Sequence, residues 1–131
     1  MNLIVCVDNN GCASFFGKRV SKDRMVEEDI KAEIRGSNLY AHPYSESFFL
    51  DPSPNIHFET DYVSAASDSD YIFYEIGDID QSAFDTIYLY CWNRNYPQDK
   101  IFKPGKSFKL INKTDFKGYS HEKITKKIYK K

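Results

Sequence analysis

The sequence predicts an α/β fold, with a mixed, mainly parallel sheet that is flanked by short helices and ends in an antiparallel strand pair. The run Leu3–Val7 is apolar throughout, as expected for a strand that is covered on both faces. Strand-like and short helix-like segments then alternate, which is typical of βαβ units. Two alternating segments close the chain without a helix between them. With 131 residues, we expect one domain, 1–131.

The opening run is the predicted central strand. Ligands of open α/β sheets lie beyond the carboxyl ends of such strands, so Asp8 and the turn Asn9–Gly11 are expected at the rim of any site. The following segment, Cys12–Val20, shows no clear period and contains a glycine. We therefore expect a loop that crosses the edge of the sheet.

A helix is predicted over residues 22–34. Apolar residues recur at helical spacing at Met25, Val26, Ile30 and Ile34, Ser21 is the expected N-cap, and Gly36 is the expected stop. Asp23 falls in the first turn, where the helix dipole favours a carboxylate.

The rest of the chain continues the alternation. Strands are expected at 38–42, 56–58, 71–76 and 86–92, a Ser45-capped helix at 44–49, a helical turn at 60–67, a loop at 93–99, and the closing strands at 107–114 and 123–129. Ile124 and Ile128 are four residues apart, so the last segment could also be a helix. We prefer a strand because Thr125 and the isoleucines are β-branched.

Composition limits the chemistry. Cys6, Cys12 and Cys91 are three in number without Cys-x-x-Cys spacing, and the three histidines are scattered, so neither a disulfide framework nor a metal site is predicted. No membrane-spanning run, leader segment or nucleophile motif occurs in the sequence. We expect a cytoplasmic protein that contacts no membrane.

Charge is distributed unevenly. From Lys100 onward there are eleven lysines against two acids, whereas the first 99 residues hold seven basic against seventeen acidic residues. The preferred interpretation is that the lysines protect a solvated sheet edge. The alternative is a protein partner that binds the Lys-rich C-terminal region, which charge reversal of Lys126, Lys127 and Lys130 would test. The acids elsewhere argue against a nucleic-acid partner.

Several segments carry a resemblance to a known family. The stretch Ala83–Tyr90, followed by Asp99–Pro104, resembles the late strand and the acidic-x-x-Phe-Pro loop of dihydrofolate reductases. The segments Leu3–Asp8 and Leu39–Ser47 resemble the family's first strand and its nucleotide-contacting corner, and the order of elements matches over nearly the whole chain. The chain is also similar to short bacterial chains labelled ribonuclease Z, although that enzyme's His-x-His-x-Asp-His motif is missing.

The resemblance implies a site by position. Asp23 stands where the family keeps its substrate-binding carboxylate, and Tyr44 and Ser45 stand in the phosphate corner, which lacks the family's Arg. The family's Gly-Gly pair appears as Glu75-Ile76-Gly77-Asp78, and a carboxylate there would repel nicotinamide phosphates. We therefore predict no bound cofactor.

The resulting hypothesis is a non-catalytic binding protein for a small polar ligand, a class that includes nucleotide-like molecules. The predicted ligand-binding residues are Asp8, Asp23, Arg24, Tyr44, Ser45, Glu75, Trp92 and Arg94. Asp23 and Arg24 would bind a polar ring, Ser45 an anionic end, and Trp92 and Arg94 a flat group. The alternatives are a divergent reductase with Asp23 as general acid, and an interaction protein of a mobile element.

Overall fold

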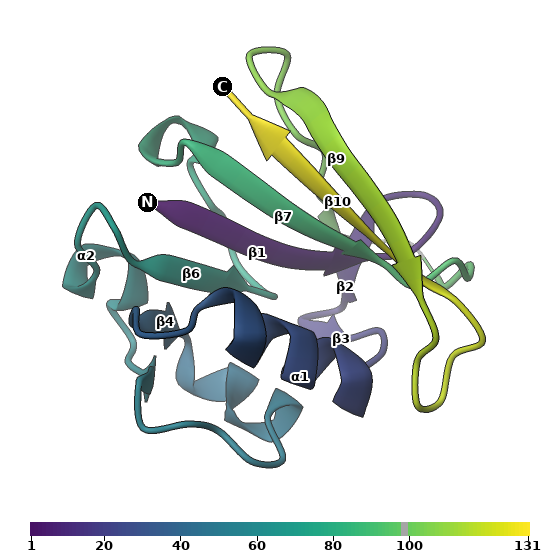
Figure 1. The fold of residues 1–131 in the computed structure, drawn as a ribbon, viewed down its shortest axis with the longest axis horizontal. Helices are drawn as coiled ribbons and strands as arrows, with labels where there is room; N and C mark the ends of the chain where they lie inside the picture. The colour runs from purple at the N-terminus through teal and green to yellow at the C-terminus, as the bar shows by residue number, and fades with distance from the viewer. Residues whose placement is uncertain (98–99) are drawn as a thin grey trace.

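A seven-stranded sheet forms the centre of the molecule, which we describe from a computed structural model for residues 1–97 and 100–131 (Figure 1). Its strand order is β5-β4-β6-β1-β7-β10-β9. The strands are β1 (Asn2–Val7), β4 (Leu39–Ala41), β5 (Ile56–Phe58), β6 (Tyr71–Tyr74), β7 (Thr86–Cys91), β9 (Lys109–Phe116) and β10 (Ile124–Lys130). Strands β5, β4, β6, β1 and β7 are parallel, whereas β10 is antiparallel to β7 and to β9. The predicted fold class, the central first strand and the closing strand pair are confirmed.

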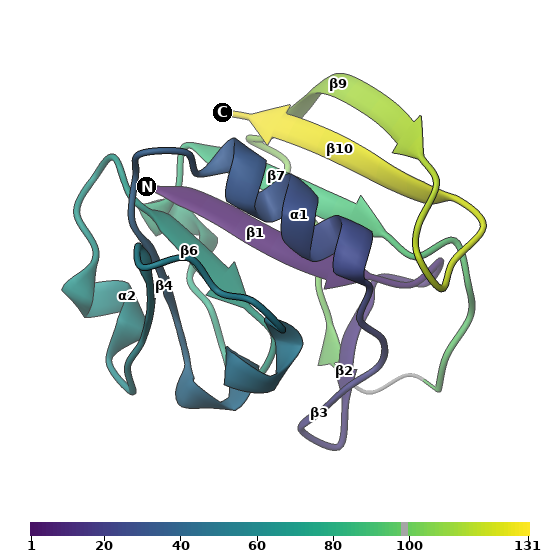
Figure 2. The ribbon, with the colours of Figure 1, turned by 60° about the horizontal axis from the view of Figure 1, so that its bottom comes forward.

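Two apolar cores lie on opposite faces of the sheet. Successive strand residues point to opposite faces of the sheet. Ile4 and Cys6 of β1 therefore pack on the face that helix α1 (Arg24–Glu33) covers, while Leu3, Val5 and Val7 pack on the other face. Figure 2 shows α1 lying along β1 and β7. Each fully buried residue of this kind stabilises the fold by about 1.5–3 kcal/mol.

Helix α1 begins two residues later than the sequence predicts. Its N-cap is Asp23, whose side chain accepts the Met25 N–H at 2.8 Å, so the expected cap at Ser21 is wrong. A carboxylate satisfies a free amide at a helix start and interacts with the helix dipole. Gly36, with φ of 77°, follows the last turn as expected.

The remaining helices are short. They are the 3-10 helices η1 (Pro43–Phe48) and η2 (Gln81–Ala83) and the single turn α2 (Tyr62–Ala65). The N-cap of η1 is His42, whose Nδ1 accepts the Tyr44 N–H at 3.0 Å. The expected cap at Ser45 is therefore wrong, because Pro43 has its φ preset for a first helical position and starts the helix earlier.

The predicted loop over residues 12–20 is a β-hairpin. Strands β2 (Cys12–Phe15) and β3 (Lys18–Arg19) pair with each other, and β2 also pairs with β8 (Lys100–Ile101) in a separate three-stranded sheet. Phe16 and Gly17 have φ of 50° and 69°, the left-handed pair that a two-residue hairpin turn requires. The strands are too short to show an alternation in the sequence.

Disulfides, metal-ligating clusters and membrane-spanning helices are absent from the residues that the structure describes. Cys6, Cys12 and Cys91 are buried and free of disulfides. Within residues 1–97 and 100–131 there is no cluster of three metal-ligating side chains, and no helix has the length and apolar character to span a membrane.

Candidate functional site

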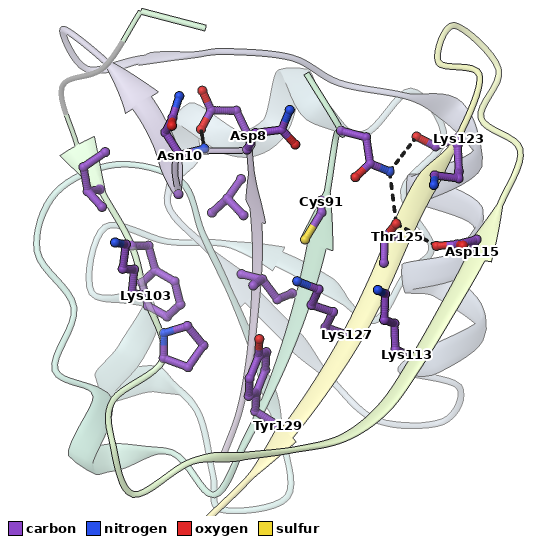
Figure 3. A pocket seen from close by; sticks show the side chains of 18 residues that line it. Asp8, Asn10, Cys91, Lys103, Lys113, Asp115, Lys123, Thr125, Lys127 and Tyr129 are labelled. Carbon is purple, nitrogen blue, oxygen red and sulfur yellow. Dashed lines mark hydrogen bonds between the residues drawn. The ribbon is translucent and has the colours of Figure 1, made fainter. Parts of the chain in front are cut away.

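An open cavity of about 750 Å³ lies on the sheet face opposite α1, at the carboxyl ends of β1 and β7 (Figure 3). We call it the sheet-face cavity. Its lining consists of Val7, Asp8, Asn9, Asn10, Gly11, Leu89, Cys91, Asn93, Ile101, Phe102, Lys103, Pro104, Lys113, Asp115, Lys123, Thr125, Lys127 and Tyr129. The size is that of a pocket for a small molecule.

Four lysines, Lys103, Lys113, Lys123 and Lys127, line the sheet-face cavity. Lys113 of β9 and Lys127 of β10 are direct cross-strand partners, and Figure 3 shows them side by side. Like charges in such a pair are destabilising. Within the described part of the chain none of the four ammonium groups forms an ion pair. Among the described lining residues, the four lysines therefore outnumber the two carboxylates, Asp8 and Asp115.

The two carboxylates of the cavity already have partners. Asp8 accepts the N–H groups of Asn10 and Cys12 at 2.8 Å and that of Tyr96 at 2.9 Å. Asp115 accepts the Thr125 hydroxyl at 2.7 Å. Asp8 is 3% exposed, so its role is to fix the turn after β1.

Apolar side chains form the floor between the lysines. Val7, Leu89 and Phe102 are buried there, and the rings of Pro104 and Tyr129 are half-buried at one end. Burial raises the pKa of the Cys91 thiol, an effect that Lys127 and Lys113 oppose. Lysines around an apolar floor can bind a ligand that has both a ring and an anionic group.

A second cluster, which we call the Arg19 corner, contains Arg19, Tyr44, Ser47 and Glu75. The Arg19 guanidinium from the hairpin forms a two-pronged ion pair with Glu75, with Nε–Oε2 at 2.6 Å and Nη2–Oε1 at 2.8 Å. It also lies over the Tyr44 ring at 5.1 Å and donates to Ser47 Oγ at 3.0 Å. Burial lowers the pKa of Arg19, but the Glu75 carboxylate more than offsets this, so the pKa is raised overall.

Ser45 lies buried beside this corner. Its hydroxyl has no hydrogen-bond partner among the described residues. Neither Ser45, Tyr44 nor Glu75 lines the sheet-face cavity. The Arg19 guanidinium thus occupies the Arg19 corner.

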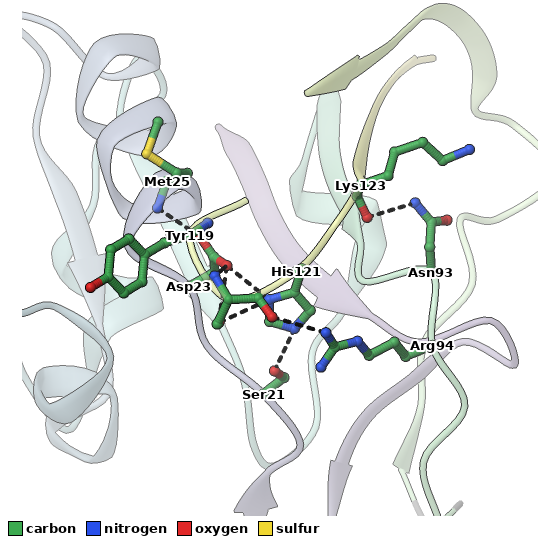
Figure 4. A network of polar contacts seen from close by, with 9 residues as sticks. Ser21, Asp23, Met25, Asn93, Arg94, Tyr119, His121 and Lys123 are labelled. Atoms are coloured by element: carbon green, nitrogen blue, oxygen red, sulfur yellow. Dashed lines mark hydrogen bonds and ion pairs between the residues drawn. The ribbon is translucent and has the colours of Figure 1, made fainter. Parts of the chain in front are cut away.

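A third cluster, which we call the Asp23 network, surrounds the start of α1 (Figure 4). Asp23 Oδ1 accepts the N–H groups of Met25 and Tyr119 at 2.8 Å. Its Oδ2 accepts the Ser120 N–H at 2.8 Å and contacts His121 Nδ1 at 2.8 Å. The other nitrogen of this ring, Nε2, lies 2.9 Å from Ser21 Oγ.

The carboxyl group of Asp23 is strongly acidic. Burial raises its pKa, but hydrogen bonds from Tyr119, His121, Ser120 and Met25 outweigh burial and hold the pKa well below its usual range. A general acid near neutral pH needs a raised pKa. The Asp23 geometry therefore opposes the role of general acid.

Three other predicted site residues lie around the same network. Trp92 is buried and stacks on the His121 ring with the centroids 4.7 Å apart. Arg94 Nη2 donates to Ser120 O at 2.9 Å, and the Arg24 guanidinium lies 4.6 Å from the centre of the Tyr119 ring. The structure thus brings Asp23, Arg24, Trp92 and Arg94 together.

The eight predicted residues are divided among three places. Asp8 borders the sheet-face cavity. Tyr44 and Glu75 belong to the Arg19 corner, with Ser45 beside it, and Asp23, Arg24, Trp92 and Arg94 lie in or around the Asp23 network. The residues Arg19, His121, Lys113 and Lys127 were not predicted as site residues. The signal for the two lysines was the alternation of lysines along the closing strands, whereas nothing local indicates that Arg19 pairs with Glu75 or that His121 pairs with Asp23.

Comparison with known proteins shows the fold. No protein-family model matches the sequence, and no curated protein matches it. Among solved structures, the chain is similar to a dihydrofolate reductase from Enterococcus faecalis complexed with NADP(H) and RAB-propyl, with a TM-score of 0.67 and 12% sequence identity. The match covers 98% of this chain and 94% of that one. The chain therefore has a dihydrofolate reductase-like fold; Asp99, part of the predicted acidic-x-x-Phe-Pro match, lies outside the described residues.

Proposed function

We propose that the protein is a binding protein for a small anionic, nucleotide-like ligand, which it holds in the sheet-face cavity without hydride transfer. The single observation that carries the proposal is the Lys113–Lys127 pair, two facing cations without an ion-pair partner in the described chain. An anion between them would turn a repulsive pair into a favourable one.

The rest of the cavity supports a ligand with a flat ring. Tyr129 and Pro104 present ring surfaces at the end of the cavity away from Asp8, as Figure 3 shows for Tyr129. Base–aromatic stacking contributes about 1–3 kcal/mol per base. Asn9, Asn10 and Asn93 supply amide groups that can hydrogen-bond the polar edge of a ring.

The residues of the Arg19 corner do not fit the nicotinamide dinucleotide that the fold family implies. The Glu75 carboxylate would repel a diphosphate, and Arg19 already satisfies that carboxylate from two nitrogens. Displacing the guanidinium would leave a buried charge unpaired, which costs about 3–5 kcal/mol. The Arg19 corner therefore does not support a reductase step with this cofactor.

Thermal-shift and calorimetric titrations with nucleoside mono-, di- and triphosphates and cyclic nucleotides test the proposal. We expect at least one to raise the melting temperature of the full chain, with affinity that falls as salt rises. The double variant K113E/K127E should bind that nucleotide at least about tenfold more weakly, since tenfold corresponds to about 1.4 kcal/mol.

Lys130→Glu is the matched control, because Lys130 lies on β10 but does not line the cavity. This variant should bind the nucleotide as the wild type does. If no nucleotide in the panel binds, or if K113E/K127E binds as tightly as the wild type, the proposal is wrong. Lys126 is unsuitable for either role, because its ammonium group pairs with Asp29 and Glu33 at 2.8 Å.

A further inference from the structure

A hydrogen-bonded line joins three side chains of the Asp23 network. Ser21 Oγ lies 2.9 Å from His121 Nε2, and His121 Nδ1 lies 2.8 Å from Asp23 Oδ2. Both distances fall within the range for a nucleophile beside a base that a third group orients. The serine and the histidine are 100 positions apart in the sequence, so only the fold brings them together.

We propose that this line is a second site, separate from the sheet-face cavity, in which Ser21 acts as a nucleophile toward small carboxylic esters. His121 is the general base, and Asp23 is a positioning residue. The carboxylate of Asp23 holds the proton of the imidazole on Nδ1 and so leaves Nε2 free to accept the proton of the serine hydroxyl.

The environment of the histidine supports this arrangement. The His121 side chain is 2% exposed, and Trp92 stacks on it with an interplanar angle of 25°, so the ring has a fixed orientation and little contact with water. Asp23 is itself held by three backbone N–H groups, from Met25, Tyr119 and Ser120. Ser21, at the open end of the line, is only half-buried and can meet a substrate.

Two cavities border the network. One is lined by Trp92, Arg94 and Glu122 among others, and the second by Lys22, Arg24, Tyr119 and Ser120 among others. Ser21 and His121 are not among the lining residues of either cavity, but Trp92, which stacks on the His121 ring, lines the first, and Asp23 lines the second. Arg94 Nη2 donates to the carbonyl of Ser120, the residue before His121, at 2.9 Å, so a positive charge lies beside the loop that carries the histidine.

The proposed reaction has two balanced halves. Ser21 Oγ bonds to the ester carbonyl carbon while its proton passes to His121 Nε2; the bond to the alcohol oxygen then breaks, and the alcohol leaves with that proton. Water next bonds to the acyl carbon and gives a proton to Nε2. The serine oxygen leaves with this proton, and the carboxylic acid is released.

Two probes of the full chain test the site, hydrolysis of p-nitrophenyl acetate and covalent labelling by a fluorophosphonate. We expect the fluorophosphonate to form an adduct on Ser21, located by peptide mass spectrometry. Ser21→Ala should abolish the adduct and lower the hydrolysis rate by about 100-fold or more, the scale of contributions from an activated group. His121→Gln should lower both readouts, with folding checked by circular dichroism and thermal melting.

Ser64→Ala is the control. Ser64 is an exposed serine of α2 whose hydroxyl donates to Asp61 O at 3.0 Å and takes no part in the Asp23 network, so this variant should keep labelling and hydrolysis close to the wild-type level. The proposal is overturned if Ser21 is not labelled or if Ser21→Ala hydrolyses the ester at the wild-type rate. If His121→Gln loses hydrolysis while Ser21→Ala keeps it, the imidazole attacks the ester without the serine, and the proposal is also overturned.

Discussion

At the scale of single residues, the molecule uses carboxylates to satisfy backbone amides. Asp8, Asp23 and Glu27 each accept at least two backbone N–H groups while nearly fully buried. Glu27 of α1 holds the amides of Leu50 and Asp51 at 2.8 Å and so ties the helix to the segment after η1. A buried charge is stable only when it is bonded in this way, so these acids are parts of the fold before they are parts of any site.

Replacement of Asp23 by Asn tests the most heavily bonded of these acids. We expect the variant to lose about 3 kcal/mol of unfolding free energy at pH 7, because an amide cannot serve the same donors. The pKa of Asp23 is lower in the folded than in the unfolded chain. Its stabilisation is therefore complete above the unfolded pKa of about 4 and is lost as pH falls through the folded pKa.

Chemical denaturation from pH 7 down to pH 2 measures this effect. The difference in stability between wild type and Asp23→Asn should shrink as the pH falls below about 4. Asp80→Asn is the control, since Asp80 also caps a helix but is exposed, and its effect at pH 7 should be small. A difference that stays constant down to pH 2 would contradict the assignment.

At the scale of elements, the loop 117–122 depends on a residue without a side chain. A Cβ on Gly118 would lie 2.7 Å from Asp23 Oδ2, 2.8 Å from Ile124 Cδ1 and 2.9 Å from His121 O. We expect Gly118→Ala to destabilise the fold by about 1–3 kcal/mol, because the added methyl group must push the loop away from α1. Thermal unfolding would measure this loss.

Gly105→Ala is the comparison for that variant. Its Cβ would meet Gln81 Oε1 at 3.4 Å, an ordinary contact, and neither glycine has a left-handed φ. The melting temperature of Gly105→Ala should stay near that of the wild type. Equal melting temperatures for the two variants would contradict the prediction, because they would show that the loop 117–122 accommodates the methyl group without loss of stability.

The sequence predicted well the elements whose pattern of apolar residues lies within one short segment of the chain. Continuous apolar residues in β1 and a helical apolar spacing at Val26, Ile30 and Ile34 each indicate one structure, and the structure has them. The hairpin was missed because β3 has only two residues and the Phe16–Gly17 turn has a positive φ at a phenylalanine, which no propensity favours. The cap of α1 was misplaced because Ser21 and Asp23 are both good N-cap residues.

The candidate site was harder to predict because its contacts are distant in sequence. His121 meets Asp23 across 98 positions, and Arg19 meets Glu75 across 56. The Glu75 carboxylate suggested repulsion of a phosphate, but the sequence could not show that an arginine of the hairpin would fill the same corner. Only the closing lysines had a local signal, the alternating pattern of the two closing segments, whereas the register that places Lys127 opposite Lys113 comes from the structure.

At the scale of the whole molecule, protection of the sheet should fall from its centre to its β9 edge. Strand β1 pairs on both sides, with β6 and β7, and its apolar residues are nearly fully buried. Among the described residues, strand β9 pairs only with β10, and Leu110 and Ile111 are 50% and 57% exposed. Amides in the centre of a packed sheet exchange only through global unfolding, whereas edge amides exchange through local opening.

Hydrogen exchange followed by mass spectrometry would measure this gradient. Peptides from β1 and β7 should be the slowest, and the β9 amides that face away from β10 should exchange within minutes at neutral pH. An exposed edge strand can also pair with another chain, and the lysines at 109, 113 and 117 oppose this by charge repulsion. Slow exchange in β9 that depends on protein concentration would contradict the prediction, because it would mean that the edge is covered by a second copy of the chain.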